Sequence, residues 1–265
     1  MSKRNTQQRR HQIVSQLLEE GEVSVDQLAQ RFSASEVTIR KDLTALEKSG
    51  QLLRRYGGAV PMPQDLVSDS NEIGSEDTST CKLAIAKAAA ERIRDHNRII
   101  IDSGSTTGAL LPALNQKHGL VVMTNSIKVA NALLELENEP TLLMTGGTWD
   151  PHSEAFQGQV AEQVLRSYDF DQLFIGADGV DLARGTTTFN ELIGLSRQMA
   201  ELAREVVVMI ESDKIGRRIP NMELGWDSID TLITDANLSP EAKAAIERQG
   251  VTVIAAPLSE STNKF

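Results

Sequence analysis

A loop rich in glycine and hydroxyl residues follows the apolar run at residues 99–101, and its residue types suit the binding of an anion. The loop consists of Asp102, Ser103, Gly104, Ser105, Thr106, Thr107 and Gly108. Glycine lets the backbone approach a ligand closely, hydroxyl groups donate hydrogen bonds, and a helix that begins here presents free N–H groups and the positive end of its dipole. The loop is therefore a candidate phosphate site, although Ser105 could equally serve only to cap the helix.

Three more polar motifs follow apolar runs further along the chain. They are Thr124-Asn125-Ser126, Gly146-Gly147 and the Asp178 of a Gly-Ala-Asp-Gly segment. If these runs are neighbouring parallel strands, all four motifs lie at one edge of a sheet, where open parallel sheets bind ligands. Lys214 would add a positive charge there, and His152 is a candidate contact that packing would explain equally well. Asn125, Asp178 and Glu191 are candidates for binding the hydroxyl groups of a sugar.

The first sixty residues carry a second set of candidates, whose types suit contact with DNA. They are Arg9, Arg10, Ser35, Glu36, Thr38, Arg40, Lys41, Thr44, Arg54 and Arg55. Arginine and lysine bind guanine edges or phosphates, and the residues at the start of a recognition helix lie nearest the bases. Glu36 and Arg40 are four residues apart and could instead form an ion pair with each other on the helix surface. Three-helix units also serve as protein-interaction modules.

Apolar spacing in this N-terminal region predicts helices over residues 7–20, 25–32 and 36–49, followed by a hairpin over 51–60. Ser24 is expected to cap the second helix, and a tight turn separates the second helix from the third. Three helices and a hairpin in this order predict a small winged helix-turn-helix, an α+β domain over residues 1–60 in which the third helix enters the major groove.

The rest of the chain alternates apolar runs with helical segments, which favours an α/β domain with a mostly parallel sheet. We expect strands at 98–102, 120–124, 141–145, 171–176, 205–210, 230–234 and 251–255. Helices are expected at 80–95, 106–116, 126–137, 158–167, 189–203 and 239–249. Residues 61–80 are polar and acidic and carry two prolines, so we expect a linker there and a second domain over residues 81–258.

The chain of 265 residues has a net charge of −10, but residues 1–60 contain ten Lys and Arg against seven Asp and Glu. The acidic remainder does not exclude DNA binding, because charges beyond about 8 Å are largely screened at physiological salt. The single Cys81 can form neither a disulfide within the chain nor a cysteine-based zinc cluster, which indicates a reducing cytoplasm. We find no apolar run of about 18 residues and therefore expect no membrane span. We also expect no cofactor and no metal ion.

The N-terminal region resembles that of the DeoR-type bacterial repressors. Residues 38–43 read Thr-Ile-Arg-Lys-Asp-Leu, Gly50 follows that helix, and residues 54–58 read Arg-Arg-Tyr-Gly-Gly. The resemblance continues through the loop at 102–107, Met123-Thr124-Asn125-Ser126, Gly146-Gly147 and the segment at 176–179. It implies a sequence-specific transcriptional regulator, a repressor of sugar-metabolism genes that binds double-stranded operator DNA as a homo-oligomer, a dimer or tetramer. The regulator would lie in the bacterial cytoplasm, on the nucleoid when bound to DNA.

The same resemblance implies that the second domain senses a phosphorylated sugar, which we expect to be a hexose or amino-sugar phosphate. Its fold would be related to the ribose-5-phosphate isomerase and CoA-transferase group. Those isomerases use acidic residues and lysines that Asp178, Asp181, Glu191 and Lys214 match in position, so the alternative is an isomerase or deaminase fused to a DNA-binding head. Residues 183–188 replace the lysine- and glycine-rich segment of the isomerases, which argues against turnover. A protein-interaction module with a vestigial site is a third reading.

Overall fold

The structure of the chain is a computed structural model, and it divides into two compact units, residues 1–70 and 71–265. Each unit is described by itself, and the domain boundaries expected from the sequence stay a prediction. The residues that the structure describes are 9–10, 12–14, 16–17, 21–48, 52–55, 57–61, 79–151, 153–188, 193–217, 219 and 221–258.

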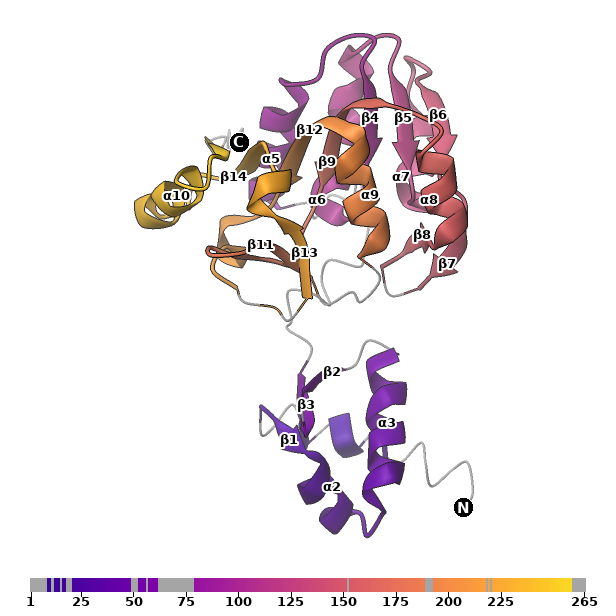
Figure 1. Ribbon diagram of the computed structural model, residues 1–265, viewed down its shortest axis with the longest axis vertical. Coiled ribbons are helices and arrows are strands. Elements are labelled where there is room, and N and C mark those ends of the chain that lie inside the picture. Colours follow the sequence, from indigo (N-terminus) through magenta and orange to yellow (C-terminus); the bar gives the residue numbers. More distant parts are fainter. Residues whose placement is uncertain are drawn as a thin grey trace, which may run out of the picture. The chain divides into compact units, whose positions relative to one another are not determined.

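The N-terminal unit is built from helices and a small antiparallel sheet, as the sequence predicts (Figure 1). Residues 9–10, 12–14 and 16–17 are helical. The other elements are β1 (Val23–Ser24), α2 (Val25–Arg31), α3 (Glu36–Lys48), β2 (Leu52–Arg55) and β3 (Gly58–Pro61), and the strand order is β1-β3-β2. Ser24 caps α2 as expected, since its hydroxyl accepts from the backbone N–H of Gln27 while the Gln27 side chain accepts from the Ser24 backbone. Ile13, Leu28 and Ile39 are fully buried and tie the three helices together.

The C-terminal unit contains a seven-stranded sheet in which every pairing is parallel. Its strands are β4 (Arg98–Ile101), β5 (Val121–Thr124), β6 (Thr141–Met144), β9 (Phe170–Ile175), β12 (Ala203–Met209), β14 (Thr231–Asp235) and β15 (Thr252–Ala256). The seven strand predictions and the predicted fold class are thereby confirmed.

Helices cover both faces of this sheet (Figure 1). They are α5 (Thr80–Ala90), α6 (Ser105–Gly108), the 3-10 helix η1 (Leu111–Gln116), α7 (Ile127–Leu134), α8 (Gln159–Leu165), α9 (Gly194–Leu202) and α10 (Pro240–Glu247), with short 3-10 turns η2 (Ser212–Lys214) and η3 (Trp226–Ser228). Ile99 and Ile101 of the central strand pack under α5, η1 and α7, while Ile100 packs under α8 and α9. The alternation follows from the two-residue period of a strand, and it explains why the central strands are apolar throughout.

Two parts of the C-terminal unit differ from the expectation. The helix expected over 106–116 is interrupted: α6 ends at Gly108 and a 3-10 helix follows. Pro112 has no N–H to bond the carbonyl of Gly108, so an α-helix cannot continue through it. Short strands were also missed, namely the hairpin of β7 (Thr148–Asp150) and β8 (Ala155–Gln157), and the antiparallel sheet of β10 (Gly179–Asp181), β11 (Gly185–Thr188) and β13 (Asn221–Gly225). No helix in the described ranges is long and apolar enough to span a bilayer.

Candidate functional site

The order of the strands places a topological switch point, where open parallel sheets commonly bind ligands, beside the central strand β4. The chain proceeds from β4 to β5 and β6 on one side, and then returns to add β9, β12, β14 and β15 on the other side. The order therefore reverses between β4 and β9, so the loops after these two strands diverge. Ligands of open parallel sheets bind at such a switch point, outside the carboxyl ends of the strands. The loops that begin at Asp102 and at Gly176 flank it.

The loop after β4 is held in shape by the strand next to it. The Asn125 amide donates to the Asp102 carboxylate at 2.7 Å, and its carbonyl oxygen accepts from the Ser103 backbone N–H at 3.1 Å. The Thr107 hydroxyl donates to the backbone carbonyls of Asp102 and Gly104. Both ends of the buried Asn125 side chain thus position the loop after β4, and its expected contact with a sugar hydroxyl stays a prediction.

A lysine that the sequence did not single out reaches this loop from α5. The Lys82 ammonium donates to the Ser105 hydroxyl at 2.9 Å and lies 3.8 Å from the Glu211 carboxylate. Gly104 is the N-cap of α6, with φ of +143° that an L side chain rarely adopts, so Ser105 is the first helical residue and not the cap. The loop thus combines a glycine turn, hydroxyl groups and a cation.

The other side of the switch point carries Asp178 and Lys214. Asp178 follows β9 and accepts from the Thr188 hydroxyl of β11 at 2.7 Å. Lys214 lies on η2 and is 6% exposed. The segment that follows it pairs with β10 through a bridge between Val180 and Ile215, which brings η2 beside the loop after β9.

The site also contains a buried carboxyl group that the sequence analysis missed. Glu223 of β13 is 8% exposed, and burial raises its pKa to about 8. The Ser196 hydroxyl opposes this rise in pKa, whereas the nearby carboxylates of Asp102 and Asp178 add to it. Burial likewise raises the pKa of Asp102 to about 6, against the hydrogen bond from Asn125. No motif surrounds Glu223 in the sequence, and only the packing of β13 brings it to these acids.

The remaining predicted residues of the edge have clear local partners. The Thr124 hydroxyl accepts from the backbone N–H of Ser126, and Ser126 caps α7. Gly147 has φ of +110°, and a Cβ there would lie 2.5 Å from the Gln157 carbonyl, so close packing against β8 requires this glycine. A Cβ on Gly146 would meet nothing within 4 Å. His152 and residues 189–192, which include Glu191, lie outside the described part of the chain, and within that part no cluster of side chains is placed to hold a metal ion.

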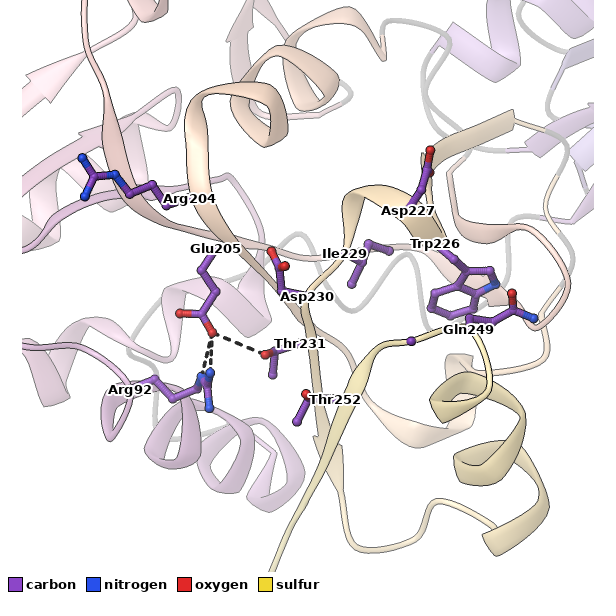
Figure 2. A pocket seen from close by; sticks show the side chains of 11 residues that line it. Arg92, Arg204, Glu205, Trp226, Asp227, Ile229, Asp230, Thr231, Gln249 and Thr252 are labelled. Atoms are coloured by element: carbon purple, nitrogen blue, oxygen red, sulfur yellow. Dashed lines mark hydrogen bonds and ion pairs between the residues drawn. The ribbon is translucent and has the colours of Figure 1, made fainter.

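A pocket of about 550 Å³ lies at the opposite edge of the sheet, near the amino ends of β12, β14 and β15 (Figure 2). Some of its polar side chains are engaged with one another. Arg92 pairs with Glu205, which also accepts from Gln172 and Thr231. Burial alone would raise the pKa of Glu205, but the hydrogen bonds from Gln172 and Arg92 hold this pKa below its ordinary value. These contacts hold the wall of the pocket together, and the pocket lacks the hydroxyl-rich loop of the switch point.

In the N-terminal unit, the expected DNA-contacting residues fall into two groups. Arg9 is 8% exposed, and both Arg9 and Arg10 bond the buried Asp42 carboxylate, at 2.6 and 2.9 Å. These two arginines thus join the first helical segment to α3, a role that the sequence analysis did not anticipate.

The second group lies on and near α3, where most of its described side chains are exposed and Thr38 and Thr44 are half-buried. Arg40 forms the ion pair with Glu36 at 2.8 Å, and the Thr44 hydroxyl donates to the Arg40 carbonyl and accepts from Arg54 at 3.1 Å. Lys41 is exposed. The Ser35 and Thr38 hydroxyls bond each other at the start of the helix, and the Arg55 side chain lies outside the described part.

Two family models match the chain, one in each unit. A family model described as the DeoR C terminal sensor domain matches residues 77–236, and one described as the DeoR-like helix-turn-helix domain matches residues 9–64. A candidate aga operon transcriptional repressor of Escherichia coli O157:H7 is 40% identical over 94% of this chain and 93% of its own length. The HTH-type transcriptional regulator GlpR of Haloferax volcanii is 33% identical over 93% and 96%.

Among solved structures, the ribose 5-phosphate isomerase A of Methanocaldococcus jannaschii matches with a TM-score of 0.37 and 20% identity, over 51% of this chain and 53% of that one. The eIF2B delta of Chaetomium thermophilum matches with a TM-score of 0.43 and 16% identity, over 58% and 56%. These structures share about half of their length with the chain. The family models and the sequence relatives together show that the chain belongs to the DeoR family of transcriptional regulators.

Proposed function

We propose that the chain represses genes of sugar metabolism by binding operator DNA, and that a phosphorylated sugar bound at the switch point modulates this binding. Residues 1–60 would form the DNA-binding domain, residues 61–80 the linker and residues 81–258 the effector domain. The protein would act as a homo-oligomer on repeated half-sites, on the chromosome within the cytoplasm. No cofactor takes part.

The observation that carries the effector site is that two strand-end loops flank the switch point, each with a lysine close to it. In the proposal, the backbone N–H groups and hydroxyls of the loop after β4 bind the phosphate, and Lys82 and Lys214 balance its charge. The carboxyl groups of Asp102 and Asp178 bind sugar hydroxyls, with His152 and Glu191 as further candidates. The resemblance to the DeoR-type repressors favours a hexose or amino-sugar phosphate as the effector.

The rival reading is an enzyme that isomerises or deaminates a sugar phosphate, with Asp178, Asp181 and Glu191 as proton carriers. Asp181 is engaged in a turn, because it accepts from the Arg184 guanidinium at 2.8 Å and from the Ala183 backbone N–H at 2.9 Å. A general base must reach the proton that it abstracts, whereas the buried Asp181 carboxylate is directed at Arg184 and Ala183. This arrangement favours sensing, and the relatives are named as regulators.

The test is a thermal-shift screen of the full chain against a panel of sugar phosphates, followed by operator binding with and without each hit. A true effector at one hundred times its Kd adds about 2.7 kcal/mol of stability. It should also change the affinity for operator DNA.

Lys82→Met should weaken effector binding by about 1.5–3 kcal/mol, the contribution of a charged hydrogen bond, while the surface variant Lys243→Met should not. Hits that leave operator affinity unchanged, or turnover in a coupled isomerase assay, would overturn the proposal.

A further inference from the structure

An exposed apolar side chain stands among the basic residues of α3. Val37 is 61% exposed, and it is the only large hydrophobic side chain with such exposure in the described part of the N-terminal unit. Single exposed apolar residues are common on protein surfaces and need no explanation by themselves. The position of Val37 is informative because it is the second residue of α3, at the end of the helix that a helix-turn-helix directs toward base edges.

The neighbours of Val37 form a hollow around it. Arg40, Lys41 and Thr44 follow Val37 by three, four and seven residues, so all four side chains lie on one face of the helix. They line an open hollow of about 280 Å³. The opposite face of α3 is the buried one, where Ile39 and other apolar residues pack into the core of the unit. The hollow therefore faces away from the core.

The chemistry of the hollow fits one feature of duplex DNA. In the major groove, thymine presents a 5-methyl group as its apolar mark, and apolar side chains read it by direct contact. Lys41 beside Val37, and Arg54, which reaches the same face through Thr44, supply the positive charge that a phosphate-lined groove requires, while Arg40 pairs with Glu36 in the unbound chain. This charge favours DNA over a second protein chain as the occupant.

We propose that Val37 contacts the 5-methyl group of a thymine in the operator half-site and thereby specifies thymine at that position. The inference rests on the proposed DNA-binding function and adds a specificity-determining residue to it. Valine has no polar group to satisfy, so the contact discriminates by the methyl group alone, whereas Arg40 or Lys41 discriminates by hydrogen bonds to bases.

The experiment removes first the 5-methyl group of thymine and then the methyl groups of Val37. The full chain first selects its binding sequence from a random duplex library. In that duplex, each thymine is then replaced singly by deoxyuridine, which lacks only the 5-methyl group. Wild-type protein should lose affinity about fourfold at one position per half-site, the value of one buried methyl group. Val37→Ala should bind the thymine duplex about four- to tenfold more weakly, and the loss at that position should disappear.

Val160→Ala is the matched control, because Val160 on α8 is 58% exposed and lies in the other unit. It should keep the wild-type deoxyuridine profile. Val37→Thr serves as a second variant that preserves the side-chain shape if Val37→Ala were to disturb α3.

The possible results test DNA binding by the chain and thymine recognition by Val37 separately. Failure of the wild-type chain to select any sequence would overturn the DNA-binding function itself. Selection of a sequence, with a deoxyuridine profile that is flat in the wild type or unchanged in Val37→Ala, would overturn the role of Val37 alone.

Discussion

Replacing Glu223 by glutamine should change how the stability of the C-terminal unit depends on pH. Glu223 is 8% exposed on β13, and burial raises its pKa to about 8 from an ordinary value of 4.5. Asp102 and Asp178 add to the rise in pKa, and the Ser196 hydroxyl and Arg197 oppose it. The folded chain therefore keeps a proton on Glu223 up to about pH 8, whereas the unfolded chain releases it near pH 4.5.

The sign follows from proton binding. Between these two pKa values the folded state binds one more proton than the unfolded state, so the free energy of unfolding falls as pH rises. The slope for one group is about 1.4 kcal/mol per pH unit, which gives about 2 kcal/mol between pH 6 and pH 7.5. For a unit of this size, that loss lowers the Tm by about 4–8 °C. Asp102 adds a fall of the same sign at lower pH, because its pKa is raised as well.

The assay is thermal unfolding of wild type and Glu223→Gln at several values between pH 6 and pH 7.5. Glutamine cannot ionise, so the variant should gain on wild type by about 2 kcal/mol across this range. Glu247→Gln, at a half-exposed position of α10, is the control and should follow wild type at every pH. Parallel curves for wild type and Glu223→Gln would show that Glu223 titrates alike in both states, and would refute the reasoning.

Three further predictions concern single positions. Asp42→Ala leaves Arg9 buried without its partner and should destabilise the N-terminal unit by about 3–5 kcal/mol, measured by hydrogen exchange of α3 amides; exchange at the wild-type rate would contradict this. Gly147→Ala places a Cβ 2.5 Å from a backbone carbonyl of β8 and should cost about 1–3 kcal/mol in thermal unfolding, more than Gly146→Ala; equal losses would contradict it. Arg40→Ala should weaken operator binding by about 1–3 kcal/mol and relax specificity at one base pair, whereas a uniform loss over all sequences would make Arg40 a phosphate contact.

The seven-stranded sheet could be predicted because the apolar runs indicate strands and their alternation with helical segments indicates parallel pairing. The apolar runs that end at Ile101, Thr124 and Ile175 are long enough to be strands and are separated by helical segments, so parallel pairing followed from the alternation. Parallel pairing then placed their carboxyl ends at one edge. The short antiparallel strands carried no such signal: β10, β11 and β13 have three to five residues each and were hidden among turns.

The contents of the candidate site could be predicted only in part. The loop after β4 is local in sequence, so its glycine and hydroxyl residues were visible. Lys82 and Glu223 were not, because Lys82 reaches the loop from the preceding helix α5 and Glu223 reaches the site from the distant strand β13, and no local motif marks either residue. The same limit applies to Arg9, whose basic side chain fits a DNA contact equally well until its buried partner on α3 is known. Long-range side-chain pairs cannot be read from residue types and spacing.

The strand order at the switch point also has a consequence for the kinetics of unfolding. The pairing of β4 with β5 joins residues about 23 apart in the chain, whereas the pairing of β4 with β9 joins residues about 73 apart. Closing the longer loop costs more chain entropy, so the seam between β4 and β9 is the slower one to form. A ligand bound by the loops after both strands would hold β4 and β9 together. It would therefore lengthen the lifetime of the folded sheet and its resistance to proteases, in addition to raising its equilibrium stability.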